Sequence, residues 1–230
     1  MEPDGCPRGN AGRLTKANLV WTRPCGHTAG VTPLETQLQQ MRDGLDLPPD
    51  RVDLSQVMPI FVPSSFFALG NWPGPFTRLR APELGLTWTV LLPNQSMRYV
   101  DFGMVHHWEA QKLDWKELAM RNLNRETNER PGVREMRRPT GRVSALAFLF
   151  EDGLGPSRLL FRQGLEVRFP EGYRVAMPER SCGLAFAQDL QGEEMAPIQR
   201  VIDHCYRNGT RPLFPTIFHP DDLLPAEPAA

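Results

Sequence analysis

The sequence predicts an α+β domain in which helices pack on a mixed or antiparallel β-sheet. Three observations lead to this prediction. Apolar residues make up 40% of the 230 residues and charged residues 23%, a balance typical of a globular chain. The 23 prolines are spread along the chain and divide it into short elements, which argues against a long helical bundle. In both halves of the chain, short apolar and β-branched segments precede an amphipathic helical segment.

The chain divides into three segments by composition. Residues 1–30 are rich in Gly, Pro and polar residues and predict a loosely ordered N-terminal arm. Residues 31–219 carry the periodic apolar patterns and predict a single α+β domain. Residues 220–230 are acidic and rich in Pro and Ala, so we expect a frayed tail.

The domain is predicted to open with a helix. Thr32 is a suitable N-cap, Pro33 suits the first helical position, and Glu35 completes a capping box. Gly44 and the prolines at 48 and 49 end the helix. Its apolar stripe consists of Leu34, Leu38, Met41 and Leu45.

Strands dominate the next stretch. Residues 57–61 form a short apolar run and predict a buried strand, whereas the proline-rich residues 70–85 predict a long loop. The β-branched and aromatic residues 86–92 are the clearest strand signal. A turn at 93–96 and a returning strand at 97–103 complete a predicted hairpin.

A helix is predicted over residues 114–125, with Asp114 as N-cap and Glu117 completing the capping box. Residues 126–142 predict a polar, arginine-rich connector, and residues 143–150 a further strand.

The second half is predicted to end with a hairpin and a helix. Residues 173–177 and 182–187 form the hairpin, turning through 178–181. An amphipathic helix follows over 193–207, and Asn208-Gly209 ends it.

An internal similarity links the two halves. The segment Val90-Leu-Leu-Pro-Asn-Gln-Ser96 resembles Val175-Ala-Met-Pro-Glu-Arg-Ser181, 85 positions later. The same displacement relates the neighbouring strands and helices, so residues 57–125 and 142–210 are two candidate β-β-β-α units. A true repeat would pack pseudo-symmetrically, because each unit alone leaves an apolar sheet face bare. The alternative is chance similarity between two hairpin-plus-helix segments.

Charge and cysteine usage limit the partners and the compartment. The formal net charge of −1 implies no polyanionic partner for the chain as a whole. The four cysteines lack paired spacing and fit reduced thiols. The N-terminal residues lack the apolar core of a signal peptide, and no run of 18 apolar residues occurs. We therefore expect a cytoplasmic protein that does not span a membrane.

One cysteine is a candidate nucleophile. Cys182 follows a predicted turn, and Arg180 nearby could lower the pKa of its thiol. His204, with Asp203 beside it, lies on the last predicted helix and could act as the base of a Cys182–His204 dyad. The alternative is that Cys182 begins a buried strand as a small hydrophobic residue.

Metal and cofactor motifs are not found. Cys25-Gly26-His27 and His106-His107 lack the spacing of a zinc site. Adjacent histidines on extended backbone also point to opposite faces. The nucleotide-binding and hydrolase motifs GxGxxG, P-loop, HExxH and GxSxG do not occur, nor does CxxC. We predict neither a cofactor nor a metal.

The arginine-rich connector is the most concentrated charge feature. Residues 121–142 hold seven arginines and three glutamates, a local net charge of +4. Arg134, Arg137 and Arg138 are candidates for binding an anion or an acidic partner through guanidinium contacts. Binding of single-stranded nucleic acid usually requires stacking aromatic residues, which the segment lacks. A solvated connector without a partner is the simpler alternative.

The order of segments resembles a bacterial family without established activity, the YtpQ-like proteins. The resemblance covers residues 57–218. It is carried chiefly by Leu118-Ala-Met-Arg-Asn-Leu123 and Val175-Ala-Met-Pro-Glu-Arg180. Family members tend to carry an Asp directly after this arginine, whereas Ser181 stands here. The resemblance implies an α+β fold and a bacterial cytosolic protein, and it implies no catalytic residue.

The leading functional hypothesis is a non-enzymatic module that binds another protein. The candidate surfaces are the arginines at 134, 137 and 138 and a Pro/Trp loop around Trp72. A thiol-dependent hydrolase or transferase using Cys182 and His204 is the first alternative. Anion or single-strand nucleic-acid binding through residues 121–142 is the second.

Overall fold

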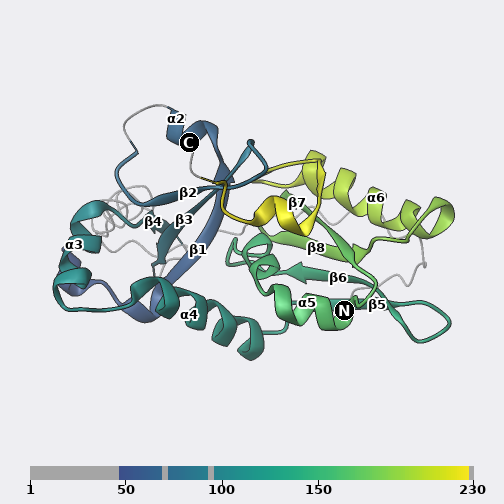
Figure 1. Cartoon of the computed structure of the whole chain (residues 1–230), viewed down its shortest axis with the longest axis horizontal. Coiled ribbons are helices and arrows are strands. Elements are labelled where there is room, and N and C mark those ends of the chain that lie inside the picture. The colour runs from purple at the N-terminus through teal and green to yellow at the C-terminus, as the bar shows by residue number, and fades with distance from the viewer. Residues whose placement is uncertain (1–46, 69–71, 93–95, 228–230) are drawn as a thin grey trace, which may run out of the picture. The chain divides into compact units, whose positions relative to one another are not determined.

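A computed structural model describes residues 47–68, 72–92 and 96–227 (Figure 1). These residues belong to one compact unit, residues 39–230. The predicted N-terminal arm and the predicted helix beginning at Thr32 lie outside the described residues. The fold is α+β, as the sequence predicted, with helices packed on two antiparallel sheets.

The first sheet is built around one central strand, β3. β1 pairs with β3 along its whole length, and β2 and β4 share the opposite edge of β3. The β-branched and aromatic residues that predicted β3 are buried on both of its faces. The four strands are β1 (Val57–Pro63), β2 (Phe76–Arg78), β3 (Leu84–Leu91) and β4 (Met97–Tyr99).

Helices cover the first sheet on the side of Trp88. Trp115 of α4 meets Trp88 edge-on at 5.1 Å between ring centroids, and Trp108 of α3 lies 5.8 Å from Trp115. Asp114 caps α4 as predicted and accepts a hydrogen bond from the backbone N–H of Glu117. The helical elements of this part are η1 (Pro49–Arg51), η2 (Leu54–Gln56), α2 (Ser65–Ala68), α3 (Phe102–Ala110) and α4 (Trp115–Glu129).

The second sheet has five strands in the order β5-β6-β8-β7-β9. Helix α6 (Gly192–Asn208) packs on one face, and η3 (Pro156–Leu160) and α5 (Arg162–Arg168) cover the other (Figure 1). The strands are β5 (Val133–Arg137), β6 (Val143–Leu149), β7 (Tyr173–Glu179), β8 (Cys182–Ala187) and β9 (Ile217–Phe218).

One apolar core joins the two sheets. Phe61 and Leu84 of the first sheet lie in the same buried cluster as Phe148 and Val175 of the second. Leu159 of η3 belongs to this cluster and is fully buried. Burial of these side chains supplies most of the driving force that holds the sheets together.

Several expectations for local structure were wrong. Residues 97–103 were expected to form one strand, but β4 ends at Tyr99 and α3 begins at Phe102 after an Asp101 N-cap. The connector at 126–142 contains the last turn of α4 and strand β5. The tail expected to fray begins with the capped helix η4 (Pro220–Leu223), in which Leu223 is buried.

The structure does not confirm the internal repeat. In the first candidate unit, β1 pairs with β3, the first strand of its hairpin. In the second, β6 pairs with β8, the second strand of its hairpin. Equal spacing in the sequence therefore corresponds to different strand orders in the two sheets.

Within the part of the chain that the structure describes, no helix is both long enough and apolar enough to cross a membrane.

Candidate functional site

The loop between β5 and β6 is fixed to α6 by Arg138. Its guanidinium donates to both carboxylate oxygens of Glu194, each at 3.0 Å, and to Asp189 at 2.8 Å. These hydrogen bonds, above all the one that Arg138 donates to Asp189, raise the pKa of Arg138, and Arg138 in turn lowers the pKa of Asp189. Arg138 is thus engaged within the fold and is not positioned to recruit a partner.

Surface ion pairs also engage Arg137, another predicted binding residue. Arg137 pairs with Glu135 and donates to the backbone oxygen of Gly141 at 2.6 Å. Arg168 of α5 reaches the same Glu135 at 3.0 Å. Much of the local positive charge that the sequence shows is therefore neutralised in the fold.

Arg134 differs from its two neighbours. It is exposed on β5 and forms no ion pair with any residue that the structure describes. Arg134 pairs with Ala147 across the β5–β6 ladder, so both side chains lie on the α6 face of the sheet. Met136 and Leu149 share that face and are 45% and 44% exposed. A cation thus stands beside two exposed apolar side chains.

Strand β5 forms the outer edge of the second sheet, and all its residues are exposed. The backbone N–H of Leu149 on β6 donates to the backbone oxygen of Gly132, just before β5. Every second residue of an antiparallel edge strand points its backbone N–H and C=O at the neighbouring strand, so those of Arg134 and Met136 also point toward β6. The backbone N–H and C=O groups of Val133 and Glu135 therefore point outward, away from the sheet. These are the groups with which a further strand would pair.

The structure does not assemble the dyad of Cys182 and His204. Cys182 is 1% exposed and begins β8, as the alternative interpretation expected. Its thiol hydrogen-bonds to Cys205, and this bond together with burial raises the pKa of Cys182, whereas a nucleophile needs a lowered one. His204 is exposed, and its Nδ1 lies 3.3 Å from the amide nitrogen of Asn208. The arrangement therefore gives the thiol-enzyme hypothesis no support.

Trp72, expected in an exposed loop, packs into the first sheet. Its ring meets those of Phe67 and Tyr99 edge-on, at 5.1 and 4.8 Å between centroids. Its indole Nε1 is buried and has no hydrogen-bond partner among residues 47–68, 72–92 and 96–227. Trp72 therefore stabilises the fold and leaves little surface for a partner.

Ser96 and Ser181, the last residues of the two similar Pro-x-x-Ser sequences, line one pocket of about 460 Å³. Arg180 and Arg211 line the same pocket, and so does Glu151. Arg180 donates to the hydroxyl of Tyr99 at 3.2 Å. Because the lining carries both signs of charge, the pocket indicates no particular class of ligand.

The arginine connector does not share this pocket. Arg130 lines a neighbouring pocket of about 650 Å³ together with Glu151 and Asp53. Arg138 lines a third pocket, of about 240 Å³, with Asp189. The arginines of the connector and the two serines thus line different pockets.

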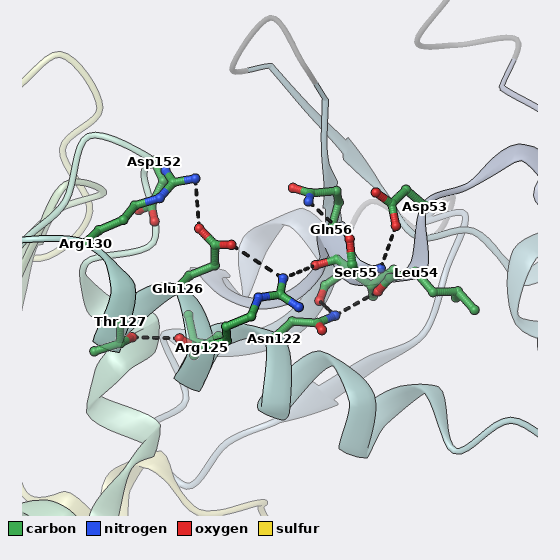
Figure 2. A network of polar contacts seen from close by, with 12 residues as sticks. Asp53, Leu54, Ser55, Gln56, Asn122, Arg125, Glu126, Thr127, Arg130 and Asp152 are labelled. Atoms are coloured by element: carbon green, nitrogen blue, oxygen red, sulfur yellow. Dashed lines mark hydrogen bonds and ion pairs between the residues drawn. The ribbon is translucent and has the colours of Figure 1, made fainter.

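A polar network around α4 attaches this helix to the chain entering β1 (Figure 2). The buried amide of Asn122 donates to the backbone oxygens of Leu54 and Val57 at 2.7 and 3.1 Å. Arg125 donates to the backbone oxygen of Ser55 at 3.0 Å. Asn122 belongs to the segment that carries the family resemblance, and its position in the fold is structural.

A buried ion pair that the sequence did not indicate continues this network. The side chain of Arg158 is fully buried and donates to both carboxylate oxygens of Asp152, at 3.2 and 2.8 Å. Its Nε donates to Thr127 of α4 at 3.0 Å, and its guanidinium stacks on Phe150. Arg158 of η3 is thus joined to α4 through Thr127 and to the loop after β6 through Asp152.

The two adjacent histidines lie on α3 and not on extended backbone. The ring of His107 hydrogen-bonds to Gln111 one turn later, at 2.8 Å. Among the described residues, no three His, Cys, Asp or Glu side chains gather closely enough to hold a metal ion. Cys25 and His27 lie outside the described residues.

Comparisons with protein-family models, with curated proteins and with solved structures found no match to this chain.

Proposed function

We propose that the chain is a protein-binding module that recruits an extended segment of its partner to strand β5. The observation that carries the proposal is the outer edge of the second sheet, where β5 pairs with β6 and with no other strand that the structure describes. Val133 and Glu135 present backbone donors and acceptors outward, and no residue of β5 is buried. An added strand would satisfy these groups through main-chain hydrogen bonds, a common mode of peptide recognition.

The neighbouring side chains favour a partner segment with acidic and apolar residues. Arg134 is exposed and would pair with a carboxylate. Met136 and Leu149 on the same face would bury an apolar side chain of the partner. Two copies of β5 would place like charges close together, and a bulge between Met136 and Arg137 interrupts the ladder. A different protein therefore fits this edge better than a second copy of the chain.

The resemblance to the YtpQ-like family supports the setting of the proposal, a bacterial cytoplasmic protein. Dispersed cysteines without paired spacing are consistent with that compartment. The resemblance implies no particular partner. The kind of partner is therefore inferred from the side chains and backbone groups of β5 alone.

The test uses two substitutions at one position. Glu135→Pro removes the outward N–H of β5, whereas Glu135→Ala keeps this N–H and removes the same carboxylate. The probe is a synthetic ten-residue peptide of repeating Glu-Thr-Val-Thr, which places Glu and Val on the same face of an extended strand, and the measurement is its Kd by fluorescence anisotropy. We expect Glu135→Pro and Arg134→Glu to weaken binding at least tenfold, and Glu135→Ala to bind like the parent chain.

Hydrogen exchange supplies the second measurement. Bound peptide should slow exchange of the Val133 and Glu135 amides and leave that of Arg134, already bonded within the sheet, nearly unchanged. The proposal is abandoned if the Pro and Ala variants bind the peptide equally well. It is also abandoned if a peptide with Lys in place of Glu binds as tightly.

A further inference from the structure

Two cysteines from distant parts of the sequence meet beneath α6. Cys182 begins β8 and is buried, and Cys205 lies in the last turn of α6 and is partly buried. Cys182 belongs to the apolar cluster between α6 and the second sheet, and Cys205 packs against this cluster. Each thiol is the main influence on the acidity of the other, so the two side chains lie close together.

The backbone holds this pair in place. Gly209, which ends α6, lies so close to Glu179 that a Cβ at this position would overlap its side chain. The chain beyond α6 is hydrogen-bonded to the β7–β8 turn, where Arg180 N–H donates to Arg211 O at 3.2 Å. Arg211 N–H in turn donates to the carboxylate of Glu179 at 3.3 Å. The last turn of α6 is thus fixed against the start of β8.

The two sulfur atoms differ in acidity. The hydrogen bond from Cys182 lowers the pKa of Cys205 to about 7, whereas the pKa of Cys182 is raised. Glu179 on β7 is the charged group that acts on both thiols, and it opposes their ionisation. His204 lies next to Cys205 in the sequence, and its ring contacts Asn208. The more accessible sulfur is therefore the one that carries the thiolate at neutral pH.

We propose that Cys205 is a site of oxidation by hydroperoxides and that Cys182 converts the oxidised form into a disulfide joining α6 to β8. The Cys205 thiolate attacks one peroxide oxygen, the O–O bond breaks, and hydroxide leaves, which gives a sulfenic acid. The sulfur of Cys182 then attacks the sulfur of Cys205 and the S–O bond breaks. The departing hydroxide takes the proton of Cys182 and leaves as water. Peroxide is reduced and the two thiols are oxidised.

The test uses the full chain with Cys6 and Cys25 replaced by Ser, treated with hydrogen peroxide and mapped by non-reducing peptide mass spectrometry. We expect one intramolecular disulfide between positions 182 and 205, and its reversal by dithiothreitol. Cys182→Ser should stop at the sulfenic acid of Cys205, which a 1,3-diketone traps. Cys205→Ser should leave Cys182 reduced.

Two substitutions at position 182 separate acidity from disulfide formation. The rate of Cys205 alkylation by iodoacetamide should titrate with a midpoint near pH 7 in the parent chain. Cys182→Ser keeps a hydrogen-bond donor and should retain this midpoint. Cys182→Ala should move it toward the ordinary thiol value of about 8.5. Circular dichroism checks that each variant is folded. If the Ala variant does not fold, the alkylation midpoints of the parent chain and the Ser variant are compared alone.

Three outcomes overturn the proposal. In the first, peroxide modifies Cys205 irreversibly while Cys182 stays reduced. In the second, the parent chain forms only intermolecular disulfides. In the third, alkylation of Cys205 follows the same pH profile in the parent, Ser and Ala chains, so that Cys182 has no influence on its neighbour.

Discussion

The two sheets differ in how their outer elements are held. In the first, β1 is buried along nearly its whole length, and α4 is attached through the buried amide of Asn122. In the second, every residue of β5 is exposed, and exposed ion pairs such as Arg138–Glu194 hold the adjoining loop. Buried hydrogen bonds are costly to lose, whereas exposed ion pairs contribute little. The first sheet thus provides rigidity, and the second provides accessible surface.

The largest effect is expected where the two regions meet. Arg158→Met leaves the carboxylate of Asp152 buried without its partner, so the free energy of unfolding should fall by about 3–5 kcal/mol. Urea denaturation measures the change. Arg162→Met is the matched control, because Arg162 pairs with Asp221 at a partly exposed site, and it should cost at most about 1 kcal/mol. Equal losses in the two variants would mean that the buried pair contributes no more than the exposed one.

The attachment of α4 is tested by two asparagines on that helix. Asn122→Ala leaves the backbone oxygens of Leu54 and Val57 without their donor, so we expect a loss of about 1–3 kcal/mol. Asn128→Ala removes an exposed contact to Asn124 and should change stability by no more than about 0.5 kcal/mol. Thermal unfolding followed by circular dichroism compares them. If both variants unfold like the parent chain, the first sheet does not depend on this network.

Two glycines, one closely packed before η3 and one on the open surface of α5, give a third comparison. A Cβ on Gly155 would lie 2.6 Å from the backbone of Ser181, so Gly155→Ala should cost about 1–3 kcal/mol. A Cβ on Gly164 in α5 would meet open space, so Gly164→Ala should stabilise the chain by about 0.5–1 kcal/mol. Opposite signs in chemical denaturation sharpen the comparison. Stabilisation by both substitutions would contradict the close packing of η3 on the β7–β8 turn.

The smallest effect is expected at Arg138, and it should depend on pH. Because Arg138 lowers the pKa of Asp189, the pair stabilises the fold above the unfolded pKa of about 3.9. This contribution is lost as the pH falls through the lower folded value. Arg138→Met should therefore reduce Tm slightly at pH 7 and less at pH 3. Arg134→Met, which breaks no ion pair with a described residue, should leave Tm unchanged at both values. A pH-independent loss for Arg138→Met would show that its contribution is not electrostatic.

Elements with strong periodicity were predictable from the sequence. Strands β3, β6, β7 and β8 carry continuous apolar or β-branched runs because sheet and helix cover both of their faces. The Asp114 N-cap and the apolar stripe that follows it predicted helix α4. The sequence predicted that α4 ends at Arg125, four residues early, because residues 126–129 are all polar and carry no apolar periodicity.

The missed elements lack such a signal. Strand β5 buries neither face, so Val133–Arg137 lacks the alternation of apolar and polar residues that predicts a strand. Helix α3 mixes Met104, Val105 and Trp108 with two histidines, and its Asp101 cap was the one usable indication. The paired thiols of Cys182 and Cys205 come from a strand and a helix whose packing no local pattern specifies. The ion pair between Arg138 and Glu194 likewise could not be predicted, because the two residues lie 56 positions apart in the sequence.

The shared core has a consequence for how the chain can be divided. Phe61 and Leu84 complete the apolar layer beneath β6 and β7, so neither sheet keeps a covered face without the other. A truncated gene product that ends between Glu129 and Val133 would expose this layer, and chaperones and proteases would act on it. Recombination or domain insertion that keeps the protein functional must therefore preserve both sheets together.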